Sequence, residues 1–337
     1  MSSSGKYKES RREFLKKTAS VGLGLYGMMQ LGIDFPNVDA ADVESKVVIA
    51  QDDKVIDKQN TVVESIVQKL LDNALMNLAG VKNRKAAWSR YFNKKDVVGI
   101  KVNTLAGRHM TSHVQLVKAI INSLKSISIP EENIIIWDKA DNDLTGAGYE
   151  INISRKGVKC LSTESTVGYT DLIMYGSIAS CYSRILSNCT ALVNVPVLKH
   201  HSMAGVTISL KNWLGAVHNP NKYHFDAAAD PYIADINMPD ILRKRRQLIV
   251  CDALVAQCNG GPGFNPNYTW NCNSLLVATD PVALDSVGTR MIEVKRKEMK
   301  LSSLKDAGIE PKYIAIAADK EHRLGMNDLK KIQLVKV

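Results

Sequence analysis

The chain has 337 residues, of which 45% are hydrophobic and 23% are charged, and this composition is typical of a globular protein with a sizeable core. The formal net charge of +10 favours anionic partners, but the basic side chains are dispersed, with short runs only at residues 243–246 and 295–297. This distribution argues against a nucleic-acid partner, and none is expected.

The first forty residues have the order of an export signal. Arg11 and Arg12 are followed by Phe-Leu-Lys at 14–16, a glycine-interrupted apolar stretch at 18–33, and small residues up to Ala40. This order resembles the twin-arginine (Tat) signal motif. We therefore expect residues 1–40 to be a Tat signal peptide, with the Tat translocase as a partner. The mature protein, residues 41–337, would then be exported folded to a periplasmic or other extracytoplasmic location.

The apolar stretch at 18–33 is too short, and too interrupted by glycine, to cross the roughly 30 Å hydrocarbon core of a bilayer. No stable transmembrane anchor is expected. The six cysteines form no Cys-x-x-Cys, haem c or ferredoxin-type iron–sulfur motif. Two interpretations stay open for them: disulfides, such as Cys181 with Cys189 or Cys258 with Cys272, and buried free thiols.

Apolar runs alternate with helical patterns along the mature chain. A strand is predicted at 46–50, a helix at 61–78, a strand at 97–103, a helix at 114–124 and a strand at 134–138. Further strands are predicted at 191–196, 247–255 and 275–279. This order predicts an α/β fold with a mostly parallel, open sheet flanked by helices. Residues 41–337 would form one domain or two intimately packed lobes.

In such a sheet the ligand crevice lies beyond the carboxyl ends of the strands, where most of the histidines of this chain fall. Imidazoles together with a carboxylate are common ligands of zinc, iron, manganese and nickel. A divalent transition metal is therefore one expected cofactor, and the candidate ligands are His109, His113, His200, His218, His224 and Asp226. The alternative is that these are loop histidines bonded to the backbone.

Lysines and asparagines also follow the predicted strands. Ammonium and amide donors suit a carboxylate or phosphate, and the candidates are Lys101, Asn103, Lys199, Lys211 and Asn212. Lys211 and Asn212 would equally well end an amphipathic helix. Gly260 and Gly261 form a loop that lets the backbone approach a ligand, or a tight turn. Downstream, Asp280 is predicted to cap a helix that begins at Pro281, with Asp285 near its start.

Three of these segments carry a family resemblance. They are Gly-Ile-Lys-Val-Asn at 99–103, the block from Gly205 to Gly215 with Thr-Ile-Ser-Leu-Lys-Asn-Trp-Leu-Gly, and Ala-Thr-Asp-Pro-Val-Ala-Leu-Asp at 278–285. The chain resembles the family known as domain of unknown function 362, from about Val97 to the closing residues. Some members of that family carry ferredoxin-type cysteine runs, which this chain lacks. The resemblance implies no particular reaction.

Two functions are compatible with these residues. The first is an exported enzyme of unassigned reaction that acts on a small anionic substrate, such as a carboxylate or sugar acid, with or without a metal. In it Lys101, Lys211, Asp252 and His201 would be catalytic, and Asn103, Lys199, Asn212, Gly260 and Gly261 would bind substrate. The alternative is a non-catalytic exported protein that binds an anionic ligand or assists a redox partner.

Overall fold

The computed structural model describes residues 43–224 and 229–337. The predicted signal peptide and Asp226 lie outside the described residues. Within them, no helix is long and apolar enough to cross a membrane.

A single ten-stranded sheet runs through the molecule in the order β12-β1-β11-β10-β7-β2-β3-β4; β8 also pairs with β10, and β9 pairs with β8. Parallel pairing predominates, as predicted, and it joins β10, β7, β2, β3 and β4. A separate hairpin is formed by β5 and β6. The strands are β1 (Ser45–Gln51), β2 (Val98–Lys101), β3 (Ile134–Asp138), β4 (Lys159–Ser162), β5 (Tyr169–Tyr175), β6 (Ile178–Ser183), β7 (Ala191–Asn194), β8 (Val197–His201), β9 (Gly205–Thr207), β10 (Arg246–Gln257), β11 (Thr269–Ala278) and β12 (Ile332–Lys336).

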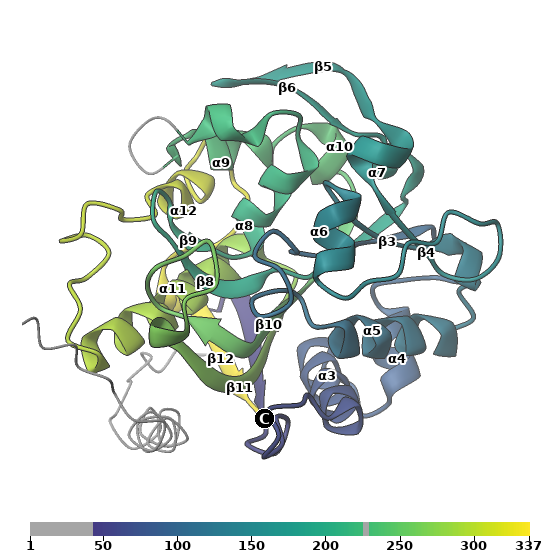
Figure 1. Cartoon of the computed structure of the whole chain (residues 1–337), viewed down its shortest axis with the longest axis horizontal. Coiled ribbons are helices and arrows are strands. Elements are labelled where there is room, and N and C mark those ends of the chain that lie inside the picture. Colours follow the sequence, from purple (N-terminus) through teal and green to yellow (C-terminus); the bar gives the residue numbers. More distant parts are fainter. Residues whose placement is uncertain (1–42, 225–228) are drawn as a thin grey trace, which may run out of the picture.

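Successive side chains along each strand point to opposite faces of the sheet, and this alternation divides the core into layers. In β1, Val48 belongs to one apolar cluster and Val47 to another, because successive side chains point to opposite faces of the sheet. Helices α3, α4 and α5 pack together over the first cluster, and α11 and α12 cover the second (Figure 1). The helices are α3 (Glu64–Ala79), α4 (Arg84–Ser89), α5 (Val114–Ser126), α6 (Asp141–Gly146), α7 (Arg184–Asn188), α8 (Ser209–Asn212), α9 (Tyr232–Ile236), α10 (Asp240–Arg243), α11 (Pro281–Glu298) and α12 (Tyr313–Ala317).

The predicted strands and helices are present, although some of them begin or end at other residues, and one strand, β11, runs antiparallel to its neighbour β10. The strand at 134–138 and the start of the helix at 114 match β3 and α5, whereas the strand predicted at 275–279 begins earlier, at Thr269. β11 runs antiparallel to β10, and the two are joined by a loop and a short turn. A connection without a crossover helix returns the chain in the opposite direction, so this pair is a hairpin.

The carboxyl ends of three neighbouring parallel strands meet at one edge of the sheet. Lys101 ends β2, Asp138 ends β3, and Asn194 ends β7 directly opposite Lys101. The short helix α8 and the 3₁₀ turn η5 (Trp213–Ala216) follow β9 and lie against this edge. The edge therefore collects polar residues from four elements, β2, β3, β7 and α8.

All six cysteines are free, and five of them are buried, so the free-thiol interpretation describes this structure. Cys251 lies in the apolar cluster under α11 and packs as a small hydrophobic side chain.

Two aspartates fix the start of α11 and its contact with α8. Asp280 is the predicted N-cap, and its Oδ1 accepts hydrogen bonds from the backbone amides of Val282 and Ala283, both at 2.8 Å. Asp285 is fully buried and accepts from the backbone amides of Ser209, at 2.7 Å, and Leu210, at 3.1 Å. These two amides belong to the first turn of α8, so Asp285 fixes where α8 begins.

Replacing Asp285 with Asn is expected to lower the free energy of unfolding by about 2 kcal/mol, because an amide NH₂ cannot accept from a backbone N–H. Urea unfolding at neutral pH measures this change. Asp240→Asn, on the surface, serves as the matched control and is expected to leave stability nearly unchanged. Equal stability of Asp285→Asn and wild type would show that Asp285 does not anchor α8.

Candidate functional site

A cavity of about 380 Å³ opens at the carboxyl edge of the sheet. Four lysines but only two aspartates line it, so the charges of its walls favour an anion. Its polar wall consists of Lys101, Asn103, Asp138, Lys139, Asp143, Lys199, His201, Thr207, Lys211, Asn212, Asn219, Asn221 and His224. Its apolar wall includes Leu105, Met203, Leu214, Pro220 and Pro262.

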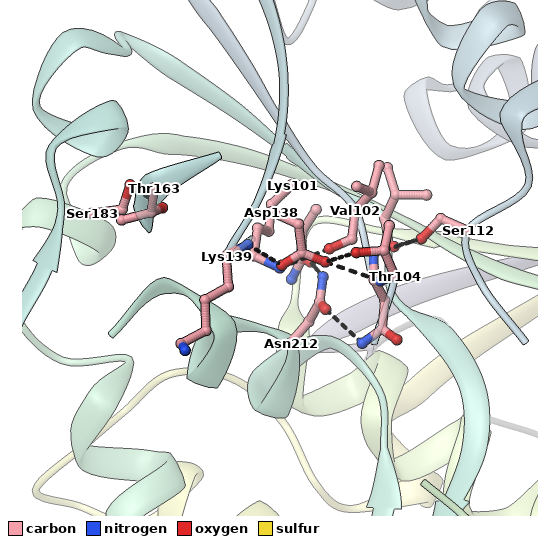
Figure 2. A network of polar contacts seen from close by, with 12 residues as sticks. Lys101, Val102, Thr104, Ser112, Asp138, Lys139, Thr163, Ser183 and Asn212 are labelled. Carbon is pink, nitrogen blue, oxygen red and sulfur yellow. Dashed lines mark hydrogen bonds and ion pairs between the residues drawn. The ribbon is translucent and has the colours of Figure 1, made fainter. Parts of the chain in front are cut away.

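A buried ion pair forms one wall of the cavity. The Nζ of Lys101 lies 2.7 Å from Oδ1 of Asp138 and also donates to the carbonyl oxygen of Val102 at 2.7 Å. The other carboxylate oxygen of Asp138 accepts from both the backbone amide and the hydroxyl of Thr104 (Figure 2). This pairing compensates the cost of burying the two charges.

Gly215, in η5, makes room for this ion pair. A Cβ at position 215 would lie 3.0 Å from Nζ of Lys101 and 3.2 Å from Oδ1 of Asp138, tighter than ordinary contacts. The absence of a side chain there lets the backbone of η5 close directly over the pair.

Two further lysines have different surroundings. Lys199, in β8, donates from Nζ to Oδ1 of Asn103 at 2.9 Å, and burial lowers the pKa of Lys199 to about 8. Lys211, in α8, is 7% exposed, and burial together with the nearby charge of Lys199 lowers the pKa of Lys211 to about 7. Its Nζ lies 3.0 Å from Nε2 of His224. Within the described ranges, no carboxylate pairs with Lys199 or Lys211.

A chain of side-chain amides extends from Lys199 into the core. Asn103 accepts from Lys199 and donates to Asn212, Asn212 donates to Asn194 at 2.7 Å, and Asn194 donates to the carbonyl oxygen of Ser209. Because each amide accepts from one neighbour and donates to the next, the orientation of every amide group is determined. The predicted ligand-binding residues Asn103 and Asn212 are thus held rigidly at the cavity wall.

His201 and His224 stack on each other, with ring centroids 5.2 Å apart and nearly parallel planes. Nδ1 of His201 accepts from the backbone amides of Met203 and Ala204, so a neutral ring carries its proton on Nε2. Burial and the adjacent Lys211 lower the pKa of His201 to about 2 and that of His224 to about 4. Both imidazoles are neutral at physiological pH and line the cavity as uncharged donors or acceptors.

The candidate metal ligands occupy several separate environments. His109 is exposed and lies against the ring of Phe264, while His218 is exposed and meets the edge of Tyr169. His200 is buried, and its Nδ1 accepts from the backbone amide of Gly261 at 3.1 Å. Burial alone would lower the pKa of His113, but the charge of Asp252 and the hydrogen bond to it together raise that pKa above its ordinary value.

Among the candidates that lie in the described ranges, only His224 is one of the residues that line the cavity, where it meets His201. No group of three or more His, Cys, Asp or Glu side chains suited to a metal ion occurs in the part of the chain that the structure describes. The geometry therefore assigns none of the described histidines as a metal ligand, and a metal cofactor stays a prediction.

Three other predicted site residues have structural contacts outside the cavity wall. Asp252 is fully buried and accepts from the backbone amide of His113 at 2.7 Å and from that of Leu254 at 3.1 Å. Gly261 packs against β8 so closely that a Cβ would lie 1.9 Å from the carbonyl oxygen of His200. Gly260 adopts a left-handed φ of 71° beside Asn265. Their neighbour Pro262, rather than either glycine, lines the cavity.

Sequence reasoning missed Asp138, Asn194 and Thr207 as parts of the site. Asp138 ends a strand that was predicted with the correct bounds, so the strand-end argument that selected Lys101 applies equally to Asp138. Asn194 ends β7 but lies behind the cavity wall, and only its contact with Asn212 reveals its role. Thr207 follows from no sequence signal that we can identify.

The lowered pKa of Lys211 predicts a pH-dependent stability. An unfolded lysine keeps its ordinary pKa of 10.5, so between about pH 7 and that value the unfolded chain binds more protons, and the free energy of unfolding rises with pH. Lys211→Met removes this contribution. We expect the variant to exceed wild type in stability by about 2 kcal/mol or more near pH 6, because one pKa unit corresponds to about 1.4 kcal/mol.

Urea unfolding at about pH 6 and about pH 10 measures the difference, which should shrink at the higher pH. Lys320→Met, at an exposed position, is the control and should show no such trend. A stability difference that is the same at both pH values would contradict a lowered pKa for Lys211.

Comparison with known proteins adds a family but no reaction. A search of curated proteins gives no match. Six chains among solved structures match, and one is a protein from Thermotoga maritima whose crystal structure was a structural genomics target. It is 10% identical with a TM-score of 0.41, and the match covers 70% of this chain and 59% of that chain, so less than two thirds of its length is spanned.

A family model described as domain of unknown function (DUF362) matches residues 98–290. The matched segment begins at the first residue of β2 and ends within α11, and it includes β8, α8 and the loop that carries Pro262. All the residues described above as lining the cavity fall inside it. The chain belongs to the DUF362 family, and the cavity is built from the segment that defines its membership.

Proposed function

We propose that the protein is an exported enzyme that binds a small carboxylate or sugar-acid-like anion in the cavity at the carboxyl edge of the sheet. One observation carries this proposal: three buried lysines, Lys101, Lys199 and Lys211, line a cavity, and among residues 43–224 and 229–337 only Lys101 of the three has a carboxylate partner. Buried cations without anionic partners are costly, and an anionic ligand would supply the missing charge.

The surrounding groups suit a ligand with several oxygen atoms. The hydroxyl of Thr207, which lines the cavity, is buried and has no hydrogen-bond partner among the residues that the structure describes. Asn103 and Asn212 are oriented by their amide chain, and His201 offers a neutral ring. A buried hydroxyl without a partner is uncommon in native proteins, and this hydroxyl would be satisfied by an oxygen atom of a bound ligand.

Catalysis is favoured over simple binding because Lys211 and His224 form a pair suited to proton transfer. Their nitrogens are 3.0 Å apart, and Lys211 has a pKa of about 7, the range in which a side chain both gives and takes a proton readily. In this mechanism Lys199 and Asn103 hold the carboxylate, and Lys211 moves a proton at an adjacent atom. The ion pair of Lys101 and Asp138 keeps the wall in place.

Binding of small carboxylates tests the proposal. Lactate and D-gluconate are expected to bind saturably, as measured by isothermal titration calorimetry, whereas their methyl esters are not. Lys199→Met should weaken the affinity by about tenfold or more, because a hydrogen bond to a charged group contributes about 1.5–3 kcal/mol. Affinity should also fall as the pH rises above about 8, where Lys199 loses its proton.

Lys320→Met, at an exposed position that is not part of the cavity lining, is the matched control and should bind like wild type. Equal affinity of Lys199→Met and wild type would overturn the assignment of the cavity as the anion site. Tight binding without turnover of any carboxylate tested would favour the non-catalytic alternative.

Export rests on the twin-arginine motif alone. Replacing Arg11 and Arg12 with Lys is expected to leave the precursor in the cytoplasm, because the motif is read through its arginine pair and not through its charge. Cell fractionation and immunoblotting measure the distribution. Lys6→Arg with Lys8→Arg is the matched control, and continued export of the Arg11 and Arg12 variant would refute the assignment.

A further inference from the structure

The four lysines of the cavity differ in what their amino groups contact. Lys101 is bonded to Asp138 and a carbonyl oxygen, and Lys199 is bonded to Asn103 and lies 3.4 Å from the carbonyl oxygen of Met110. Lys139 forms an ion pair with Glu164 at 2.6 Å. Across the described residues, Lys211 is the one of the four whose amino group has no oxygen acceptor, since its partner is a ring nitrogen of His224.

This environment favours an amine over an ammonium ion. Lys211 is almost completely buried, and the charge of Lys199 acts on it from within the same cavity. Desolvation and a neighbouring cation are the two physical devices that turn a lysine into a nucleophile, because both disfavour its protonated form. The geometry thus separates one reactive amine from three lysines held by oxygen atoms.

We propose that Lys211 is a covalent site, at which the amine captures the carbonyl carbon of a small oxo acid as an imine. This inference rests on the proposed function, because Lys199 and Asn103 are taken to hold the carboxylate of the same molecule. It narrows the substrate class from carboxylates in general to carboxylates that also carry a ketone or aldehyde.

The step balances without an oxidant or reductant. The nitrogen lone pair of Lys211 forms a bond to the carbonyl carbon, and the electrons of the C=O π bond move to oxygen, which takes up a proton. A second proton is then added to the same oxygen of this carbinolamine. The carbon–oxygen bond breaks, and water leaves as the C=N bond forms. The protons pass between nitrogen and oxygen, and Nε2 of His224, 3.0 Å from Nζ, is placed to relay them.

Reductive trapping on the full chain tests the imine. The protein is incubated with sodium cyanoborohydride and either pyruvate or D-glucuronate, whose open form carries an aldehyde, and is then digested and analysed by peptide mass spectrometry. The reductant delivers hydride to the imine carbon and leaves a stable secondary amine. We expect Lys211 to be modified at least about tenfold faster than any other lysine, because burial and the neighbouring Lys199 favour its amine form and its amino group contacts a ring nitrogen.

Lactate and D-gluconate are the matched controls, since they have the carboxylate but no ketone or aldehyde, and they should give no adduct. Lys211→Arg should abolish the fast modification while circular dichroism shows an intact fold. Modification spread over exposed lysines, with Lys211 not preferred, would overturn the inference.

The two proposals fail in different ways. If lactate and D-gluconate bind in the cavity but neither oxo acid labels Lys211, the covalent site is refuted and the anion site stands. If none of the four carboxylates binds and none labels Lys211, the anion site is refuted as well.

Discussion

The ion pair between Lys101 and Asp138 is the contact on which the cavity depends. β2 and β3 are parallel neighbours, so their carboxyl ends place the two residues side by side with both charges buried. The carboxylate accepts from the backbone and hydroxyl of Thr104 as well as from Lys101, which compensates much of its desolvation. Gly215 allows η5 to close over the pair, and this closure forms one side of the cavity.

Because Asp138 is committed to Lys101, the other buried lysines are left to weaker partners. Lys199 donates to an amide oxygen and Lys211 contacts an imidazole, and burial lowers the pKa of both lysines. Three side chains of one chemical type thus acquire three different properties from their surroundings. In our proposals Lys101 is a structural charge, Lys199 is an anion-binding group, and Lys211 is the group that moves a proton and reacts as an amine.

The sequence predicted the location of the site better than its chemistry. The end of a parallel strand is a position that hydrophobic runs reveal, and Lys101, Asn103 and Lys199 were selected in this way. The histidines were grouped by their distance along the chain, which says little about distance in space. His109 and His218 lie on exposed loops with aromatic neighbours, whereas His201 and His224 stack because β8 and the turn before residue 225 converge at the cavity. Asp252, which was predicted to be catalytic, is a buried strand residue that pairs with His113.

What the sequence determined by itself was local: the strands and helices with clear apolar patterns, the N-cap at Asp280, and membership in the DUF362 family through its motif blocks. These follow from residue spacing and from side chains that act on their own backbone. The tertiary structure decided which lysine is paired, which amides orient one another, and that β11 turns back along β10. Those properties depend on contacts between residues such as Lys199 and Asn103, or Asp285 and Ser209, that are far apart in the chain. Charge and burial act through space, so spacing along the sequence does not reveal them.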